Sequence, residues 1–234
     1  MDINFNIENL FAIELFGQQI WFNQTVVNTW LIMLFLIIVA IVVRIKLRKM
    51  EDIPSGFQNA VEAIIETFEN FVKSMAGEKL GFIAPWFFMV FVFILTSNFS
   101  AVLGLRPPTA DWATTFALAL ATFSLIHIVG VKFRGGEYFK SLLGPTPALA
   151  PLILPLNIIG ELARPISLSF RLFGNVLAGL ILMSLIYALL PMFLLFGLPV
   201  ALHAYFDIFV GALQTFIFCA LSLAFIGAAS TAEE

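Results

Sequence analysis

Long runs of apolar residues restrict the fold of this chain more than any other feature. The first, residues 25–43, contains no charged residue, and four more apolar segments of similar or greater length follow it. A membrane-spanning helix needs roughly 20 apolar residues, and the chain is 61% hydrophobic and 12% charged, with a mean hydropathy of +1.01. These values exclude a soluble globular protein. They predict an all-α integral membrane protein with five membrane-embedded helices.

The expected elements form one membrane domain of 234 residues. We expect an external N-terminal segment at 1–24, a first span at 25–49, an amphipathic surface helix at 55–79, and second and third spans within 82–131. A helical hairpin fills residues 148–234. Its two helices, about 156–190 and 196–229, are each longer than the ~30 Å hydrocarbon thickness at about 1.5 Å per residue. We therefore expect this hairpin to be long and tilted.

Basic residues gather after the first and third spans, which predicts the orientation of the chain. Nine of the 12 Lys and Arg residues lie in these two stretches. Such clusters are held on the cytoplasmic side of a membrane. The first 24 residues carry three acidic residues and no Lys or Arg, unlike a secretory signal. We expect a retained N-terminus on the outside and a C-terminus in the cytoplasm.

Residues 57–75 have the pattern of an amphipathic helix. Apolar residues recur at helical spacing, and Glu62, Glu66 and Glu69 fall on the opposite face. An acidic polar face does not suit attraction to anionic lipid. Packing against neighbouring protein therefore explains the helix better than binding to the membrane surface, which stays the alternative.

Several functional classes are excluded by what the sequence lacks. A net charge of −3 supplies no basic field for nucleic acid. Cys219 is the only cysteine, so no intrachain disulfide or cysteine-based metal cluster can form. The sequence has no phosphate-binding loop, no His-Glu-x-x-His and no Gly-x-Ser-x-Gly. We expect no nucleotide site, cofactor, metal site or catalytic residue in this chain.

Polar side chains inside the last two apolar segments are the exceptions that indicate function. A charge at mid-bilayer costs roughly 2.5 to 3.5 kcal/mol and is usually functional. Helical spacing places one set on a single stripe of the first segment and another on a stripe of the second. The stripes consist of Glu161, Arg164, Arg171 and Asn175, and of His203, Asp207 and Gln214. Two such stripes on a hairpin can face a common path.

Arg171 is the most informative of these residues. It lies about 15 residues into its segment, too far from either end to extend to a headgroup. Arginine cannot be deprotonated in proteins, so Arg171 acts only as a fixed positive charge. Glu161, His203 and Asp207 are the groups able to exchange a proton.

Each of these residues also has a purely structural interpretation. Arg171 could pair with Asp207 or Glu161 inside the bundle, and Glu161 could form a local ion pair with Arg164. His203 could be a hydrogen-bonded residue near the outer surface, and His127 on the third span could be a hydrogen-bonded residue of the core.

The segment 165–175, PISLSFRLFGN, resembles the most characteristic segment of subunit a of the F-type ATP synthase. Residues 214–218, QTFIF, resemble the last helix of that family, and the order of spans agrees over nearly the whole chain after residue 24. The resemblance implies the static half of a rotary ion motor, with two aqueous half-channels, beside a ring of c subunits that each carry a membrane-buried carboxylate. The implied partners also include peripheral-stalk b subunits and the lipid bilayer. A bacterial cell membrane is the expected location, and an organelle membrane is the second choice.

Roles are implied for several residues by the same resemblance. Arg171 corresponds to the essential arginine that faces the ring, and Asn175 and Gln214 to polar positions near it. Many members carry a glutamate nine positions after the arginine, where this chain has Leu180. Asp207, aided by His203, is then the expected ion-handling carboxylate of the outer channel. We expect H⁺ as the coupling ion, with Na⁺ as the alternative.

Two other classes of function compete with this one. A free-standing secondary ion transporter would use the stripes of Arg171 and Asp207 to bind an anionic substrate. A structural membrane subunit would use its buried charges only to hold helices together.

Overall fold

The computed structural model describes residues 9–15, 18–48, 56–141, 143, 150–189, 191 and 197–231. Parts of the expected external segment (1–8 and 16–17), the start of the hairpin at 148–149, most of its connection at 192–196 and the extreme C-terminus lie outside the described residues. So do Lys49, at the end of the expected first span, and residue 55, where the amphipathic helix was expected to begin.

Five helical stretches in the described residues are long and apolar enough to cross a membrane. They are α1 (Gln24–Lys46), the run Glu78–Leu103, α4 (Trp112–Arg134), α6 (Ala150–Leu189) and the run Leu198–Ser230. The second combines the 3₁₀-helices η1 (Glu78–Ile83) and η2 (Ser100–Leu103) with α3 (Ala84–Phe99). The last combines α7 (Leu198–His203), the π-helix η6 (Ala204–Val210) and α8 (Gly211–Ser230). The predicted all-α membrane fold is confirmed.

Shorter elements connect these helices. The amphipathic helix α2 (Gly56–Ala76) follows α1, a 3₁₀ turn η3 (Pro108–Ala110) precedes α4, and α5 (Gly136–Ser141) follows it. Asn23 and Asp111 cap α1 and α4 by accepting hydrogen bonds from Val26 N and Ala113 N at 2.9 and 3.0 Å.

An antiparallel hairpin of β1 (Asn9–Leu15) and β2 (Gln18–Asn23) precedes α1 and was not foreseen. Its pairs include Ile13 with Ile20 and Ala12 with Trp21. β-branched and aromatic residues favour strands, but this segment is too short and too polar to be recognised in a search for membrane spans.

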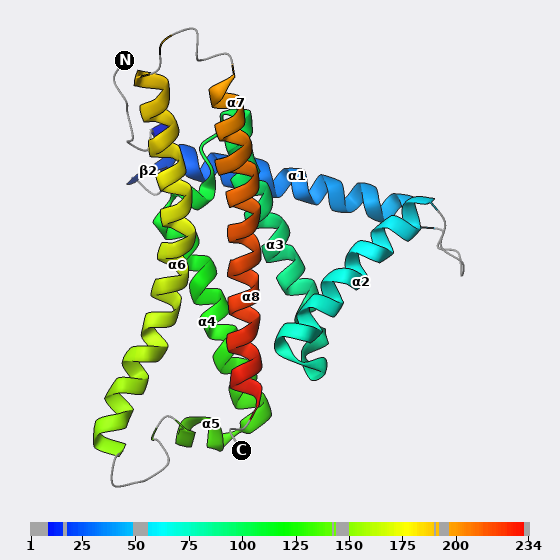
Figure 1. Ribbon diagram of the computed structural model, residues 1–234, viewed down its shortest axis with the longest axis vertical. Coiled ribbons are helices and arrows are strands. Elements are labelled where there is room, and N and C mark those ends of the chain that lie inside the picture. The colour runs from blue at the N-terminus through cyan, green and yellow to red at the C-terminus, as the bar shows by residue number, and fades with distance from the viewer. Residues whose placement is uncertain are drawn as a thin grey trace.

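The core of the bundle lies around α8. This helix packs against α2, α3 and α4, and α6 packs mainly against α4. Phe87, Ile94, Phe218 and Leu223 are fully buried there. In Figure 1, α4, α6 and α8 run along the long axis of the molecule, and α1 runs transverse to them.

The lengths and directions of α1 and α6 bear on how the chain sits in a membrane. α6 has 40 residues, or about 60 Å at 1.5 Å per residue, twice the ~30 Å hydrocarbon thickness. α1 has 23 residues, close to one membrane thickness. Because α1 and α6 run in different directions (Figure 1), both cannot follow the membrane normal. The excess length of α6 is accommodated either by tilting or by ends that leave the membrane.

Candidate functional site

A pair of amide side chains joins α6 to α8. Asn175 donates from Nδ2 to Gln214 Oε1 at 2.7 Å. Gln214 is only 2% exposed, so this bond lies where the helices pack. Its Nε2 has no partner among the described residues, and a buried amide donor of this kind is usually satisfied by ordered water. The two helices therefore meet at a polar contact within an apolar interface.

Arg171 lies one helical turn before Asn175, and it is exposed. In the part of the chain that the structure describes, no carboxylate pairs with it. Asp207 instead contacts His203, and Glu161 contacts Arg164. Among the described residues, Arg171 therefore does not form the ion pair with Asp207 or Glu161 that the structural interpretation required. The guanidinium stands on a face of α6 that the rest of the chain leaves uncovered.

Small residues share this face of α6 with Arg171. Counted together with Arg171 they recur at intervals of three or four, which places them along one side of a helix, and they are exposed or half-buried. They are Gly160, Ala163, Ser167, Gly174 and Ala178. A Cβ added at Gly160 or Gly174 would meet no atom within 4 Å. Small side chains let the backbone of another helix approach closely, so the face around the guanidinium is shallow enough to receive one.

A small cavity lies beside the amide pair. Its lining includes Asn98, Asn175, Leu180, Asp207 and Gln214. The centre of a water molecule can occupy about 20 Å³ of it, and roughly 10–15 Å³ is enough for one water. The cavity brings together three of the six residues that we predicted for the site. The other three do not line it.

His203 and Asp207 form a second polar contact in the hairpin. His203 Nδ1 lies 2.5 Å from Asp207 Oδ2, and His203 Nε2 lies 2.9 Å from the hydroxyl of Tyr187 near the end of α6. Sequence reasoning missed Tyr187 because it is 16 residues from His203 along the chain. The only available signal was a polar aromatic residue near the end of an apolar span.

The π-helix η6 lies inside the expected stripe of His203, Asp207 and Gln214. That stripe assumed 3.6 residues per turn, whereas a π-helix has wider turns. Asp207 and Gln214 line the cavity, and His203 does not line it but contacts Asp207.

Asn98 of α3 is a further polar residue of this region that sequence reasoning missed. It is 3% exposed. Its Nδ2 donates to Gly211 O at 3.0 Å and to Thr215 Oγ1 at 3.2 Å, and its Oδ1 accepts from Thr109 at 2.7 Å. These bonds fix the first turn of α8 beside the cavity. An asparagine within an otherwise apolar span was the signal that could have found it.

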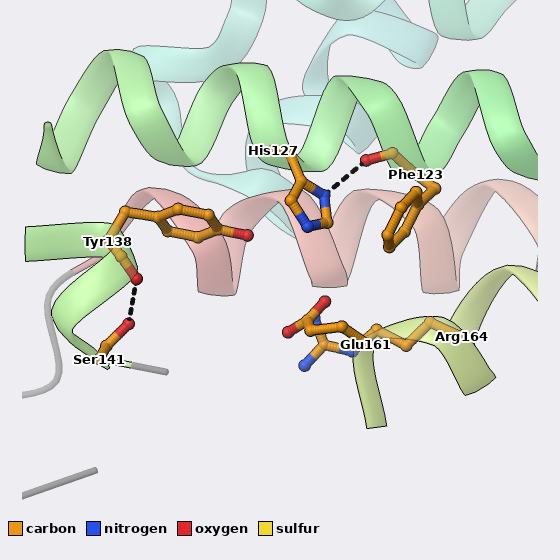
Figure 2. A network of polar contacts seen from close by, with 6 residues as sticks. All are labelled: Phe123, His127, Tyr138, Ser141, Glu161 and Arg164. Atoms are coloured by element: carbon orange, nitrogen blue, oxygen red, sulfur yellow. Dashed lines mark hydrogen bonds and ion pairs between the residues drawn. The ribbon is translucent and has the colours of Figure 1, made fainter. Parts of the chain in front are cut away.

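Glu161 lies in a separate polar cluster toward the other end of α6 (Figure 2). Arg164 Nη1 donates to Glu161 at 2.8 Å, which matches the local ion pair weighed as an alternative. His127 contacts the carbonyl of Phe123 at 2.9 Å, as expected for a hydrogen-bonded interior residue. Figure 2 shows the Tyr138 hydroxyl and the His127 ring on the side that faces Glu161 and Arg164. The structure does not bring Glu161 together with the cavity residues.

Tyr138 of α5 is the buried aromatic residue of this cluster, and its ring contacts that of His127. It is 5% exposed, and burial raises the pKa of its phenol above 10.0. The ring lies against Gly130 of α4, where an added Cβ would come within 2.5 Å of Tyr138 Cε2. Arg164 also stacks over Phe225 of α8 at 5.1 Å from the ring centroid. The side chains of this cluster thus join α4, α5, α6 and α8 through contacts with one another.

Comparison with known proteins identifies the family. Residues 26–227 match the family model described as ATP synthase A chain. The chain belongs to the ATP synthase A chain family. It is 41% identical over 205 residues to ATP synthase subunit a 1 of Syntrophotalea carbinolica, covering 87% of this chain and 84% of that protein. It is 37% identical to ATP synthase subunit a of Geobacter sulfurreducens over 204 residues, covering 87% and 86%.

The ATP synthase A chain match includes all six predicted site residues, which lie between positions 161 and 214. It also includes all of α1 except its first two residues. Its relatives are bacterial, and with its five apolar helices the chain is a multi-pass protein of a bacterial cell membrane.

Proposed function

We propose that this chain is the stator subunit of the membrane sector of a rotary ATP synthase, in which H⁺ flow past Arg171 drives a ring of c subunits. The observation that carries the proposal is the state of Arg171. It is a permanent cation on a long apolar helix, exposed and without a carboxylate partner among the described residues. A charge within the hydrocarbon of a membrane is costly without a partner, and the small-residue face around Arg171 suits a partner that approaches from another helix.

A moving carboxylate is the partner that this arrangement fits. A fixed cation favours the ionised form of an approaching carboxylate, so a ring site must release its proton before it passes Arg171. The same charge repels a cation that would cross directly. Protons must then enter on one side of Arg171 and leave on the other, drawing roughly 2.3 kcal/mol per elementary charge per 100 mV.

The cavity beside Asn175 and Gln214 is the proposed inner end of the outer half-channel. Asp207 is its titratable group, and Leu180 of α6 lines the same space. Many family members have a glutamate at the position of Leu180. A carboxylate contributed by η6 in place of one from α6 would reach the same cavity. Asp207 therefore stands in for that glutamate.

Protons are the proposed ion because the cavity offers a single carboxylate and amides. Na⁺ is bound by several oxygen ligands, and no group of three or more His, Cys, Asp or Glu residues that could hold a metal ion occurs in the described part of the chain. The test is ATP synthesis by the assembled complex with and without added Na⁺ at fixed pH. A rate that does not respond supports H⁺, and a rate that depends on Na⁺ contradicts it.

The proposed orientation places the N-terminus outside and the C-terminus in the cytoplasm. The basic residues at the ends of α1 and α4, Arg44, Lys46, Lys132 and Arg134, support it. The exposed face of α1 and the acidic face of α2 are the proposed contacts of peripheral-stalk b subunits.

The variant Arg171→Ala tests the proposal in the assembled complex. We expect proton-driven ATP synthesis in membrane vesicles to be lost and the amount of assembled complex to be unchanged. Lys140→Ala is the matched control, since it removes a cation that is exposed on α5 outside the spans. Synthesis should then stay at the level of the unmodified chain.

Other outcomes would favour the competing functions. Failure of assembly with normal coupling in the remaining complexes would favour a purely structural role for Arg171. Ion transport by the purified chain alone in vesicles, without a ring, would favour a free-standing transporter. Either result would overturn the stator proposal.

A further inference from the structure

Tyr187, His203 and Asp207 form one continuous hydrogen-bonded line across the hairpin. The Tyr187 hydroxyl lies 2.9 Å from His203 Nε2, and His203 Nδ1 lies 2.5 Å from Asp207 Oδ2. The line begins on α6, passes through the last residue of α7 and ends in η6. Of the titratable side chains that the structure describes, Tyr187 and Asp207 are the two in hydrogen-bonding contact with His203.

Exposure falls steadily along this line. Tyr187 is 45% exposed, and the side chains of His203 and Asp207 are 30% and 9% exposed. Asp207 lines the cavity that also contains Asn175 and Gln214. The line thus leads from the surface of the chain to the space beside the amide pair.

The two bonds of His203 determine how its ring must be held. An ionised Asp207 only accepts, so Nδ1–H of His203 donates to it. In the neutral ring Nε2 then accepts from the Tyr187 hydroxyl, and in the charged ring Nε2–H donates to the phenol oxygen. A hydroxyl does both by rotating. A phenol, whose ordinary pKa is about 10, does not need to ionise to do so.

We propose that Tyr187 is a positioning residue for proton entry, which holds the His203 imidazole against Asp207 in both of its charge states. The inference rests on the proposed function. Without the phenol oxygen, Nε2 of His203 loses its only protein partner among the described residues, and the ring is free to turn away from Asp207. The exposed end of the path is then no longer connected to the cavity.

The variant Tyr187→Phe keeps the ring and removes the hydroxyl. In vesicles that carry the assembled complex stripped of its catalytic sector, we expect passive proton uptake to slow by about three- to tenfold. The pH profile of uptake should also change, because the His203 ring then keeps only its bond to Asp207. Tyr187→Gln, which keeps a donor and an acceptor, should recover part of the rate.

Tyr205→Phe is the matched control. Tyr205 is 53% exposed, and its ring stacks on Phe209 at 5.8 Å. Its hydroxyl has no hydrogen-bond partner among the residues that the structure describes, so uptake and its pH profile should be unchanged. If Tyr187→Phe lowers only the amount of complex and leaves the pH profile of the remainder intact, its role is structural and the inference is wrong.

The test separates this inference from the stator proposal. A Tyr187→Phe complex that behaves like the control, while Arg171→Ala still abolishes synthesis, would overturn the role of Tyr187 alone. Retained synthesis in Arg171→Ala would overturn the stator proposal itself.

Discussion

Arg164 and Arg171 are identical residues, seven positions apart on α6, in different surroundings. Arg164 is held by Glu161 at 2.8 Å and by the ring of Phe225, so its charge is neutralised within the chain. Arg171 has neither kind of contact among the described residues. The residue type therefore does not decide the role. What differs is whether an anion lies within reach, and Arg164 finds one in Glu161, three residues earlier on the same helix.

At the residue scale, Gly130→Ala tests how tightly Tyr138 is enclosed. The added Cβ would lie 2.5 Å from Tyr138 Cε2, so the ring must move. We expect the free energy of unfolding to fall by about 1–3 kcal/mol, as overpacking usually costs. Thermal unfolding in detergent measures this, and Gly136→Ala, where an added Cβ meets nothing within 4 Å, is the control. An equal loss in both variants would show that Tyr138 is not confined.

The raised pKa of Tyr138 gives a prediction about alkaline pH. The folded chain binds the phenolic proton of Tyr138 more tightly than the unfolded chain does. The stability that this protonation contributes is therefore complete below pH 10.0. It is lost as the pH rises from there through the folded pKa. An absorbance titration of the tyrosines should show one phenol that ionises late. Its disappearance in Tyr138→Phe would assign it, and a late phenol that persists would contradict the prediction.

At the element scale, three different helices of the last two spans contribute polar residues to one cavity. α6 contributes Asn175, η6 contributes Asp207 and α8 contributes Gln214. Asn98 of α3 fixes the first turn of α8 through Gly211 and Thr215. Asp207 lies in the π-helix η6, and π-helices are frequent at functional sites.

The shared cavity predicts that its carboxylate can be moved between helices. Asp207→Asn should slow proton-driven synthesis by roughly tenfold or more, because it removes the only carboxylate in the lining. Adding Leu180→Glu to that variant places a carboxylate in the same space and should restore part of the rate. Leu180→Gln in the same background is the matched control, and equal rescue by both would show that charge is not what matters.

Close packing of α2 on α8 gives a second prediction at this scale. A Cβ at Gly227 would lie 3.0 Å from the carbonyl oxygen of Ala76, a backbone atom with little freedom to move. Gly227→Ala should push the end of α2 away from α8 and lower thermal stability by about 1–3 kcal/mol. Ala228→Leu adds bulk on the exposed side of the same turn and should have little effect. A stable Gly227→Ala complex would show that this contact yields easily.

At the scale of the whole molecule, the direction of α1 relative to α6 and α8 matters most (Figure 1). α6 has 40 residues, and Arg171 lies near the middle of its length on an exposed side. Under the proposed function, a rotating ring would approach the chain from this side and not from an end of the bundle.

Labelling of single cysteines tests the orientation of the whole chain. Native Cys219 is fully buried, and Cys219→Ser removes it. In that background Leu103→Cys, at a position 78% exposed, should react with a membrane-impermeant maleimide from the outside. Lys140→Cys should react only from the cytoplasmic side. The reverse pattern would invert the proposed topology.

The sequence by itself determined the number of spans and the amphipathic helix, and it singled out the polar residues in the last two segments as candidates. Length and hydropathy act locally, and a charge in lipid is costly wherever the chain goes next. Sequence also predicted that Glu161 and Arg164 could pair, because three residues apart on a helix is a local distance.

Only the tertiary structure decided which polar residues meet. Asn98 and Gly211 are 113 positions apart, and Asn175 and Gln214 are 39 apart. Such contacts depend on how helices pack, which periodicity does not encode. His203 contacts Asp207 but does not line the cavity, which spacing along the chain could not decide. The uncovered face of Arg171 emerged for the same reason: whether a charge is paired depends on every helix around it.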